Sequence, residues 1–460
     1  MLNTLLEPAR EVELAREFAD LRASEFSRLD RTGIAYLDYT GSALHPESLV
    51  RAHAALLDRE VLGNPHSEHG PSRHSAELME AARDTVLAFF NADPAVYTVC
   101  FAANATSAMK LVAEAYPFGK GRGLVLSVDN HNSINGIREL ARRARAPVRY
   151  IALDSDLRLR NPHAALNVAS RQMAGGLLAF PAQSNFSGVR HDLGLVTHAH
   201  RLGFEVLLDA AAFVPSNVLD LGEHAPDFVA LSFYKMFGYP TGIGALIARR
   251  DSLGRLRRPS FSGGVVDFVS VQNDMYQLAK GARAFEDGTP DFLGICAVTH
   301  GLAFLQRVGV ARIHEHVASL TMSLIDGLQR LEHRNGCAVA RVYGPNATSA
   351  RGGSVAFNVV GPTGHPTSYA LVETRARERG VALRGGCFCN PGCAESAFGF
   401  HARRSREAML AAAHEGFTIE RFATHMERDV AVGAIRASVG MANNARDVER
   451  AIAVVASFAD

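Results

Sequence analysis

The sequence predicts an α/β protein, with a large domain built on a mostly parallel central sheet and a smaller α+β domain. Three observations lead to this prediction. The chain has 460 residues, which is long for a single core and suits two domains of unequal size. From about residue 75 to residue 250, short β-rich runs alternate with helix-like segments, the pattern of a parallel sheet covered on both faces. After Asp251 this alternation gives way to loops and then to a mixture of short strands and helices.

The first thirty residues predict an amphipathic helical arm. Apolar side chains recur there among acids and arginines, at Leu5, Leu14, Phe18, Leu21 and Phe26. We expect this arm, residues 1–30, to pack with the small domain. A short strand is predicted directly after it, at residues 34–38.

The large domain is expected to span residues 31–290. Helices are predicted at residues 75–90 and 107–116, where apolar positions have helical spacing. Strands are predicted at short apolar runs, which cover residues 97–101, 124–127, 176–180, 205–208, 228–232 and 244–247. In a sheet of this kind, functional side chains collect at the carboxyl ends of the strands and in the loops that follow.

The remaining residues, 291–460, are expected to form the small α+β domain. Loops rich in Gly, Pro and Ser precede it at residues 260–264 and 286–290, and residues 297–331 predict two helices. Residues 340–460 then mix short strands with helices. The sequence contains no internal repeat and no low-complexity tract.

Composition excludes several classes of protein. The apolar fraction of 47% and the charged fraction of 21% are ordinary for a globular protein, and the net charge of +1 gives no indication of binding to nucleic acid or to an anionic membrane. No apolar run approaches the roughly 18 residues of a membrane-spanning helix, and the N-terminus lacks the basic segment of a signal peptide. Six cysteines are too sparse for a disulfide framework. We therefore expect a cytoplasmic location.

One lysine is unusual because the chain has only four, Lys110, Lys120, Lys235 and Lys280, and arginine supplies the rest of the basic charge. Lys235 follows a predicted strand and lies in an aromatic stretch, residues 232–242 (SFYKMFGYPTG). Arginine cannot replace lysine as a Schiff-base nucleophile, because its guanidinium stays protonated. The position of Lys235 therefore indicates a need for an amine. A surface lysine beside a strand end is the alternative interpretation.

A carboxylate ends the preceding predicted strand. Asp209 and Lys235 lie at consecutive strand ends, so the two side chains can converge on one planar heterocycle. Pyridoxal phosphate requires such a pair: a lysine for the Schiff base and a carboxylate that keeps the pyridine nitrogen protonated. The alternative for Asp209 is that it caps the next helix.

The phosphate of such a cofactor needs hydrogen-bond donors. Ala105 and Thr106 lie between a predicted strand and a predicted helix, where backbone N–H groups and the Thr106 hydroxyl would hold an anion. Ser232, three residues before Lys235, could add a second hydroxyl. The alternative interpretation of this segment is a plain helix N-cap.

Two further polar residues follow other strands. His131, after residues 124–128, could stack on the cofactor plane and handle protons, although a lone loop histidine is often only solvated. Asn185 follows the strand that ends at Phe180 and could donate a hydrogen bond to the phenolic oxygen of the ring. Five weak indications at successive strand ends of one sheet together predict a pyridoxal phosphate site.

Several motifs resemble those of one family. They lie at residues 36–38 (YLD), 64–67 (NPHS), 232–242, 384–392 (RGGCFCNPG) and 436–438 (RAS), and so extend over nearly the whole chain. On these motifs the chain resembles the fold-type I pyridoxal phosphate enzymes of the class V aminotransferase and cysteine desulfurase superfamily. Its motifs are most similar to those of the N-terminal desulfurase domain of molybdenum cofactor sulfurases.

The resemblance implies roles for the predicted site residues. Lys235 would form the Schiff base, Asp209 would pair with the pyridinium, His131 would stack on the ring and Asn185 would bind the ring oxygen. Phosphate ligands would be Thr106, Ser232 and, from the neighbouring subunit of a homodimer, Thr289. Two positions depart from the family: Ala212 replaces a frequent Gln, and Tyr234, also expected at the cofactor, replaces a frequent His before the lysine.

The segment Arg384-x-Gly386-x-x-Cys389 matches the desulfurase loop in this family. The resemblance implies that Arg384 binds the substrate carboxylate and that Cys389 attacks the substrate sulfur. The chemistry fits, because arginine offers a bidentate fork and a nearby cation favours the thiolate. A glycine-rich loop would let the thiol swing toward the substrate. We expect sulfur to pass from L-cysteine, or a related thiol or selenol amino acid, to Cys389 with release of alanine.

Three cysteines lie within seven residues, at Cys387, Cys389 and Cys393, and this spacing leaves alternatives open. The three could ligate a metal or an iron–sulfur cluster, although no fourth ligand accompanies them and we expect no metal. They could also only pack, or Cys387 or Cys393 could be a resolving thiol.

The reaction and the sulfur acceptor also leave alternatives open. A C–S lyase, an aminotransferase or an epimerase would use the same lysine, and a non-catalytic sulfur-carrier scaffold would keep the fold. The resemblance includes no counterpart of the acceptor-binding C-terminal domain of the sulfurases. The sulfur acceptor is therefore open: it is either a separate sulfur-acceptor protein or part of a specialised biosynthetic pathway that uses the sulfur.

Overall fold

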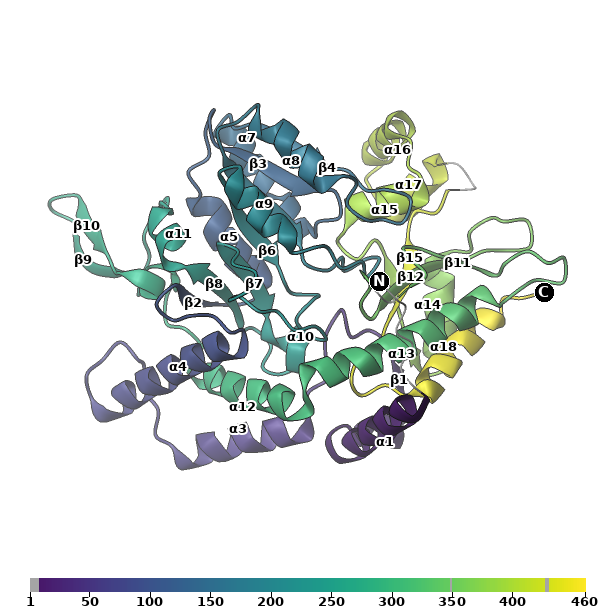
Figure 1. Ribbon diagram of the computed structural model, residues 1–460, viewed down its shortest axis with the longest axis horizontal. Coiled ribbons are helices and arrows are strands. Elements are labelled where there is room, and N and C mark those ends of the chain that lie inside the picture. Colours follow the sequence, from purple (N-terminus) through teal and green to yellow (C-terminus); the bar gives the residue numbers. More distant parts are fainter. Residues whose placement is uncertain (1–7, 348–349, 427–429) are drawn as a thin grey trace.

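The computed structural model describes residues 8–347, 350–426 and 430–460, so Leu5 of the predicted arm lies outside the described residues. A seven-stranded sheet forms the centre of the molecule (Figure 1). Its strands, in spatial order, are β2 (Tyr97–Ala102), β8 (Gly244–Arg249), β7 (Phe228–Ser232), β6 (Phe204–Asp209), β5 (Gly176–Pro181), β3 (Gly123–Ser127) and β4 (Val148–Ile151). The strands from β7 to β4 are parallel, whereas β8 is antiparallel to both of its neighbours. The predicted α/β class with a mostly parallel sheet is confirmed.

The sheet is buried on both faces, which explains why most of its strands are continuous apolar runs. Alternate side chains enter different apolar clusters: Leu178 and Val206 lie in one, and Leu177 and Leu207 lie in the other. Helices connect successive strands along the chain. They include α5 (Ala105–Ala115), α6 (Asn132–Asn135), α7 (Ile137–Arg143), α8 (Pro162–Ser170) and α9 (Gly194–Arg201). The carboxyl ends of the parallel strands therefore open onto one edge of the sheet.

A β-hairpin projects from this part of the molecule (Figure 1). Its strands are β9 (Val266–Ser270) and β10 (Met275–Leu278), and short helical segments flank it at α11 (Arg250–Arg255) and η1 (Gly281–Phe285). The sequence predicted only loops near this segment. The sequence did not predict the hairpin because most of its side chains are exposed, including the apolar side chains of Phe268 and Tyr276. Neither strand therefore has the buried face that gives a strand a clear apolar pattern.

The rest of the chain forms a long helical connection and a second sheet. Helices α12 (Phe292–Val308) and α13 (Val310–Gln329) confirm the predicted helix pair. The second sheet is antiparallel, in the order β11 (Ala340–Val342), β12 (Ser354–Val359), β15 (Ala434–Ser438) and β14 (Arg384–Gly386). The helices of this part are α14 (Tyr369–Glu378), α15 (Pro391–Phe398), α16 (Ala402–His414), α17 (Ile419–His425) and α18 (Ala445–Ala456).

The N-terminal helix α1 (Pro8–Glu25) lies along α13 and close to α18 (Figure 1). Arg22 from α1 forms a buried ion pair with Asp447 at 2.7 Å, and Arg10 pairs with Glu315. The next elements are α2 (Arg28–Thr32), β1 (Ala35–Tyr36), which pairs with β13 (Val381–Ala382), α3 (Glu47–Arg59) and α4 (Gly70–Phe89). Domain boundaries at residues 30 and 290 stay a prediction.

Among the described residues, no individual helix combines the length and the apolar character needed to cross a membrane. The pair α12 and α13 would do so only as two segments bent by 68°, and many of its apolar side chains are buried in the fold.

Candidate active site

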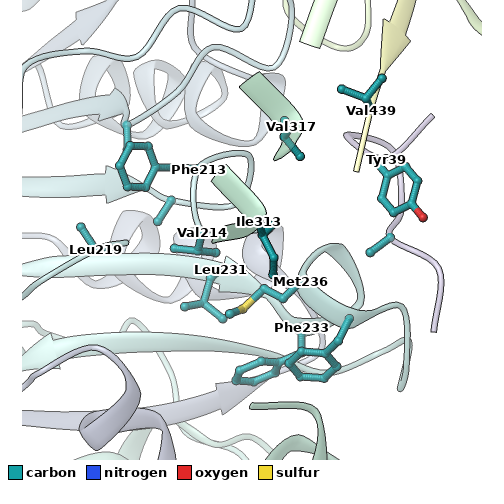
Figure 2. Close-up of a cluster of buried hydrophobic side chains, with 14 of the residues drawn as sticks. Tyr39, Phe213, Val214, Leu219, Leu231, Phe233, Met236, Ile313, Val317 and Val439 are labelled. Carbon is teal, nitrogen blue, oxygen red and sulfur yellow. The ribbon is translucent and has the colours of Figure 1, made fainter. Parts of the chain in front are cut away.

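Lys235 lies in the short helix α10 (Phe233–Phe237), which follows β7 directly. Its neighbours Phe233 and Met236 belong to an apolar cluster that also contains Ile313 from α13, and this packing fixes α10 against the core (Figure 2). The Lys235 side chain is half-buried and makes no hydrogen bond or ion pair with any described residue.

Electrostatics place Lys235 within reach of the other predicted residues. Burial lowers the pKa of its amine, and the guanidinium groups of Arg436 and Arg384 lower it further. The charges of Asp209 and Cys389 raise it. An amine with a lowered pKa is the form that a Schiff-base nucleophile needs. The half-buried side chain and the lowered pKa favour the interpretation of Lys235 as a cofactor lysine over that of an ordinary surface lysine.

Asp209 is the last residue of β6 and pairs with Ala230 of β7, which leads to Lys235. Its side chain is buried, and one carboxylate oxygen accepts a hydrogen bond from Ala211 N at 3.0 Å. Turns rather than a helix follow at residues 211–216, so the alternative of a helix cap does not apply.

The candidate phosphate cradle lies at the start of α5. This helix begins at Ala105 rather than at Ser107 as predicted, because the side chain of Asn104 accepts from Ser107 N at 3.0 Å and caps it. Ala105 and Thr106 therefore lie in the first turn, where the helix dipole favours an anion and the N–H of Thr106 has no hydrogen-bond partner among the described residues. Ser232 belongs to the same cradle, since its hydroxyl accepts from Ala105 N at 2.8 Å.

His131 caps the next helix, α6, and its ring is half-buried rather than solvated. Its Nδ1 accepts from Ser133 N at 3.1 Å, so Nε2 carries the hydrogen in the neutral ring. Burial lowers the pKa of this imidazole, with Lys235 and Arg436 acting in the same direction and Asp209 opposing them. The hydroxyl groups of Ser133 and Thr106 lie 2.7 Å apart and link His131 to the cradle.

The cysteine loop, residues 387–390, is held against the strand ends of the large sheet. Asn132 N donates to Cys389 O at 2.7 Å, and the Asn185 side chain donates to Phe388 O at 2.7 Å. The Asn390 side chain donates to Asp129 O at 2.7 Å and to Asn185 Oδ1 at 2.9 Å. Any swing of the loop would have to break these bonds.

Cys389 is exposed on this loop, whereas the two neighbouring cysteines are not. Burial raises the pKa of the Cys387 thiol to about 11, and burial also raises the pKa of Cys393 well above its usual range. Both thiols stay protonated near neutral pH, which disfavours a resolving role and favours packing. Among the residues that the structure describes, no group of three or more His, Cys, Asp or Glu side chains could hold a metal.

Arg384 is bound by a carboxylate of the chain itself. Its Nη2 lies 2.6 Å from Asp38 Oδ2, and Arg436 Nη2 lies 2.9 Å from Asp38 Oδ1. Sequence reasoning assigned no role to Asp38 or Arg436, although both belong to the motifs at residues 36–38 and 436–438. Arg436 is buried and its Nε has no hydrogen-bond partner among the described residues, so it can bind a carboxylate as well as Arg384 can.

Two predicted cofactor contacts are less central. Tyr234 is half-buried, and burial raises its pKa while the charge of Arg384 partly opposes this, so its phenol lies near Arg384. Thr289 is exposed and accepts a hydrogen bond from Asn64 at 3.3 Å. It lines a cavity of about 410 Å³, which Ser107 of α5 also lines.

These residues fit pyridoxal phosphate. The amine of Lys235 has no competing partner in the part of the chain that the structure describes, the carboxylate of Asp209 is buried on the adjacent strand, and a capped helix N-terminus lies beside them. Gly244 of β8 leaves room for the cradle, because a Cβ there would lie 2.7 Å from the backbone of Asn104. The fold and this set of residues define a fold-type I pyridoxal phosphate enzyme.

Comparison with known proteins agrees with this class. The model of the family described as aminotransferase class-V matches residues 35–451, and the chain belongs to this family. It is 36% identical over 420 residues to the molybdenum cofactor sulfurase of Arabidopsis thaliana, which covers 83% of this chain and 51% of that protein. It is 35% identical over 401 residues to the molybdenum cofactor sulfurase of Bos taurus, with 83% and 45% covered. The chain thus spans about half the length of these relatives.

Solved structures share the fold. An apo cysteine desulfurase from Thermococcus onnurineus NA1 superposes with a TM-score of 0.78 at 23% identity, covering 99% of both chains. The cysteine desulfurase CsdA from Escherichia coli gives a TM-score of 0.74 at 23% identity, covering 96% of this chain and 98% of the other.

Proposed function

We propose that this protein is a cysteine desulfurase, which takes sulfur from L-cysteine as a persulfide on Cys389, releases alanine and passes the sulfur to an acceptor. The observation that carries the proposal is the position of Cys389. Its side chain is exposed, and a charge on its thiol would raise the pKa of the Lys235 amine. Its backbone carbonyl accepts a hydrogen bond from Asn132 N, beside His131. The names of the relatives, sulfurase and cysteine desulfurase, support the same chemistry.

Each polar residue of the site has a role in this proposal. Pyridoxal phosphate supplies an electron sink for the substrate carbon atoms. Lys235 holds the cofactor and Asp209 keeps its pyridine nitrogen protonated. The remaining contacts are His131 and Tyr234 at the ring, Asn185 at the ring oxygen, and Ala105, Thr106 and Ser232 at the phosphate. Arg384 and Arg436 bind the substrate carboxylate, because both guanidinium groups lie within electrostatic reach of Lys235.

Sulfur transfer needs no external oxidant. The thiolate of Cys389 attacks the substrate sulfur, and an S–S bond forms as the substrate C–S bond breaks. The electron pair passes to the carbon, which takes up a proton and becomes the methyl group of alanine. The sulfur then leaves Cys389 when a nucleophile of the acceptor attacks it.

We further propose a homodimer in which Thr289 of one copy reaches the phosphate of the other. The exposed hydroxyl and the cavity that Thr289 shares with Ser107 support this role. A reducing cytoplasm suits the chain because all six cysteines are free thiols. The acceptor is proposed to be a separate protein.

Incubation of the purified holoenzyme with L-cysteine tests the proposal. We expect alanine release and a mass increase of one sulfur atom on Cys389. Cys389→Ala should abolish both, whereas Cys387→Ser, two residues away, should retain both. If Cys389→Ala still releases alanine at the wild-type rate, persulfide chemistry is wrong, and a C–S lyase becomes the better interpretation. A purified protein without the absorbance band of a lysine-bound cofactor would indicate a non-catalytic scaffold.

A further inference from the structure

One carboxylate joins the two arginines of the site. Asp38 accepts hydrogen bonds from Arg384 Nε at 3.0 Å and Nη2 at 2.6 Å, and from Arg436 Nη2 at 2.9 Å. The Asp38 side chain is 15% exposed and that of Arg436 is 3% exposed. The three residues come from distant parts of the sequence, and we call them the Asp38 triad.

The backbone leaves space for this arrangement at Gly41. A Cβ at that position would lie 2.5 Å from Arg384 Nη2 and 2.6 Å from Asp38 Oδ2. Arg436 is fixed from its other side, because its Nη1 donates to Asn185 O at 3.0 Å and its guanidinium lies over the Phe388 ring. The surrounding backbone and side chains therefore hold the triad in one arrangement.

The charges of the triad do not cancel. Two guanidinium groups face one carboxylate, which leaves a single positive charge beside Lys235. The buried Arg436 also keeps one N–H, at Nε, without a partner among the described residues. One carboxylate of a ligand would satisfy this charge and this donor. A second negative charge on the ligand would exceed the single positive charge that the triad supplies, and the carboxylate of Asp38 would repel it.

We propose that Asp38 is a specificity-determining residue, which restricts the site to amino acids with one carboxylate and an uncharged side chain. This inference rests on the proposed function for the place where the amino acid binds, and it names the substrate class of that site. Asp38 contacts the arginines rather than the reacting atoms. It therefore acts as a positioning residue that sets the charge of the carboxylate site.

A matched ligand pair tests this role. L-Asparagine and L-aspartate have the same size and differ by one charge, and their dissociation constants can be measured from the absorbance of the bound cofactor. The wild-type holoenzyme should bind asparagine more tightly than aspartate. Asp38→Asn keeps the shape and removes the charge, so it should shift the ratio of the two constants toward aspartate by about tenfold. Asp38→Glu keeps the charge and should retain the wild-type preference.

Arg384→Gln provides an independent test at a half-exposed position. It removes one positive charge and should shift the ratio away from aspartate. The double variant Asp38→Asn with Arg384→Gln has the wild-type charge and should return the ratio to its wild-type value.

Two results would overturn the proposal. One is an Asp38→Asn variant that weakens both ligands equally, as a purely structural role would. The other is an unchanged ratio in Arg384→Gln, which decides the matter even where Asp38→Asn does not fold. Both measurements report binding, so they stand even if L-cysteine yields no alanine, the result that would refute the proposed function.

Discussion

Asn390 should control how firmly the cysteine loop is closed. Its side chain is fully buried and makes three hydrogen bonds, two donated to Asp129 O and Asn185 Oδ1 and one accepted from Cys393 N at 3.2 Å. Asn390→Ala removes all three and leaves buried groups unpaired. At about 1 kcal/mol for each bond, closure of the loop should weaken by about 3 kcal/mol. The open form of the loop then becomes about a hundredfold more populated.

Alkylation of individual thiols measures this opening. Cys393 is fully buried in the first turn of α15, so it should react with N-ethylmaleimide about a hundredfold faster in Asn390→Ala than in the wild type. Peptide mass spectrometry under native conditions gives each rate separately. Cys100, buried in β2, serves as the internal control because its protection does not depend on the loop. We also expect slower desulfuration, since Cys389 is no longer held beside His131.

Asn390→Asp separates the two functions of the side chain. It keeps the oxygen that accepts from Cys393 N but lacks the donors to Asp129 and Asn185. Its carboxylate would face two oxygens, so the loop should open at least as far as in the alanine variant. If Cys393 stays as protected in both variants as in the wild type, the loop is not held by Asn390 and this reasoning fails.

Three further predictions concern stability and cofactor binding. Burial lowers the pKa of His316 to about 4 from an ordinary 6.5, so the unfolded state binds more protons between these values. The free energy of unfolding, measured with urea, should therefore fall by about 2 kcal/mol from roughly pH 7 to pH 5. The His316→Phe variant should lose this part of the pH dependence. Glu286→Gln breaks a buried bidentate pair with Arg83 at 2.7 Å and should lower stability to urea by about 3 kcal/mol. Gly244→Ala pushes a Cβ against Asn104 and should weaken pyridoxal phosphate binding to the apoenzyme by about tenfold in a fluorescence titration.

Much of the fold could be predicted because local sequence patterns indicate most of its strands and helices. Buried parallel strands are apolar throughout, so alternating strands and helices were visible in the sequence. The direction of β8 could not be predicted, because an antiparallel strand in a covered sheet has the same apolar pattern as a parallel one. The four-residue α6 and the edge strand β4, which has exposed residues, also gave no clear pattern, and the 13-residue helix α3 was not predicted either.

The site could be predicted only in part, for a different reason. Lys235 and Asp209 follow adjacent strands, so their convergence follows from the topology of a parallel sheet. The contact between Asp38 and Arg436 joins residues from opposite ends of the chain, and no local pattern indicates it. The same holds for the bonds from Asn132 and Asn185 to the cysteine loop, which depend on how the second sheet docks against the first.

The exposure of Cys389 has a consequence for the fate of the sulfur. A persulfide formed there would sit at the surface of the protein, on a backbone tied down by Asn132 and Asn185. Small thiols in solution could reach it as easily as a dedicated protein could. Loss of sulfur as hydrogen sulfide would then rise with the concentration of free reductant. Efficient delivery would require a recipient that covers Cys389 and keeps those thiols away while the transfer takes place.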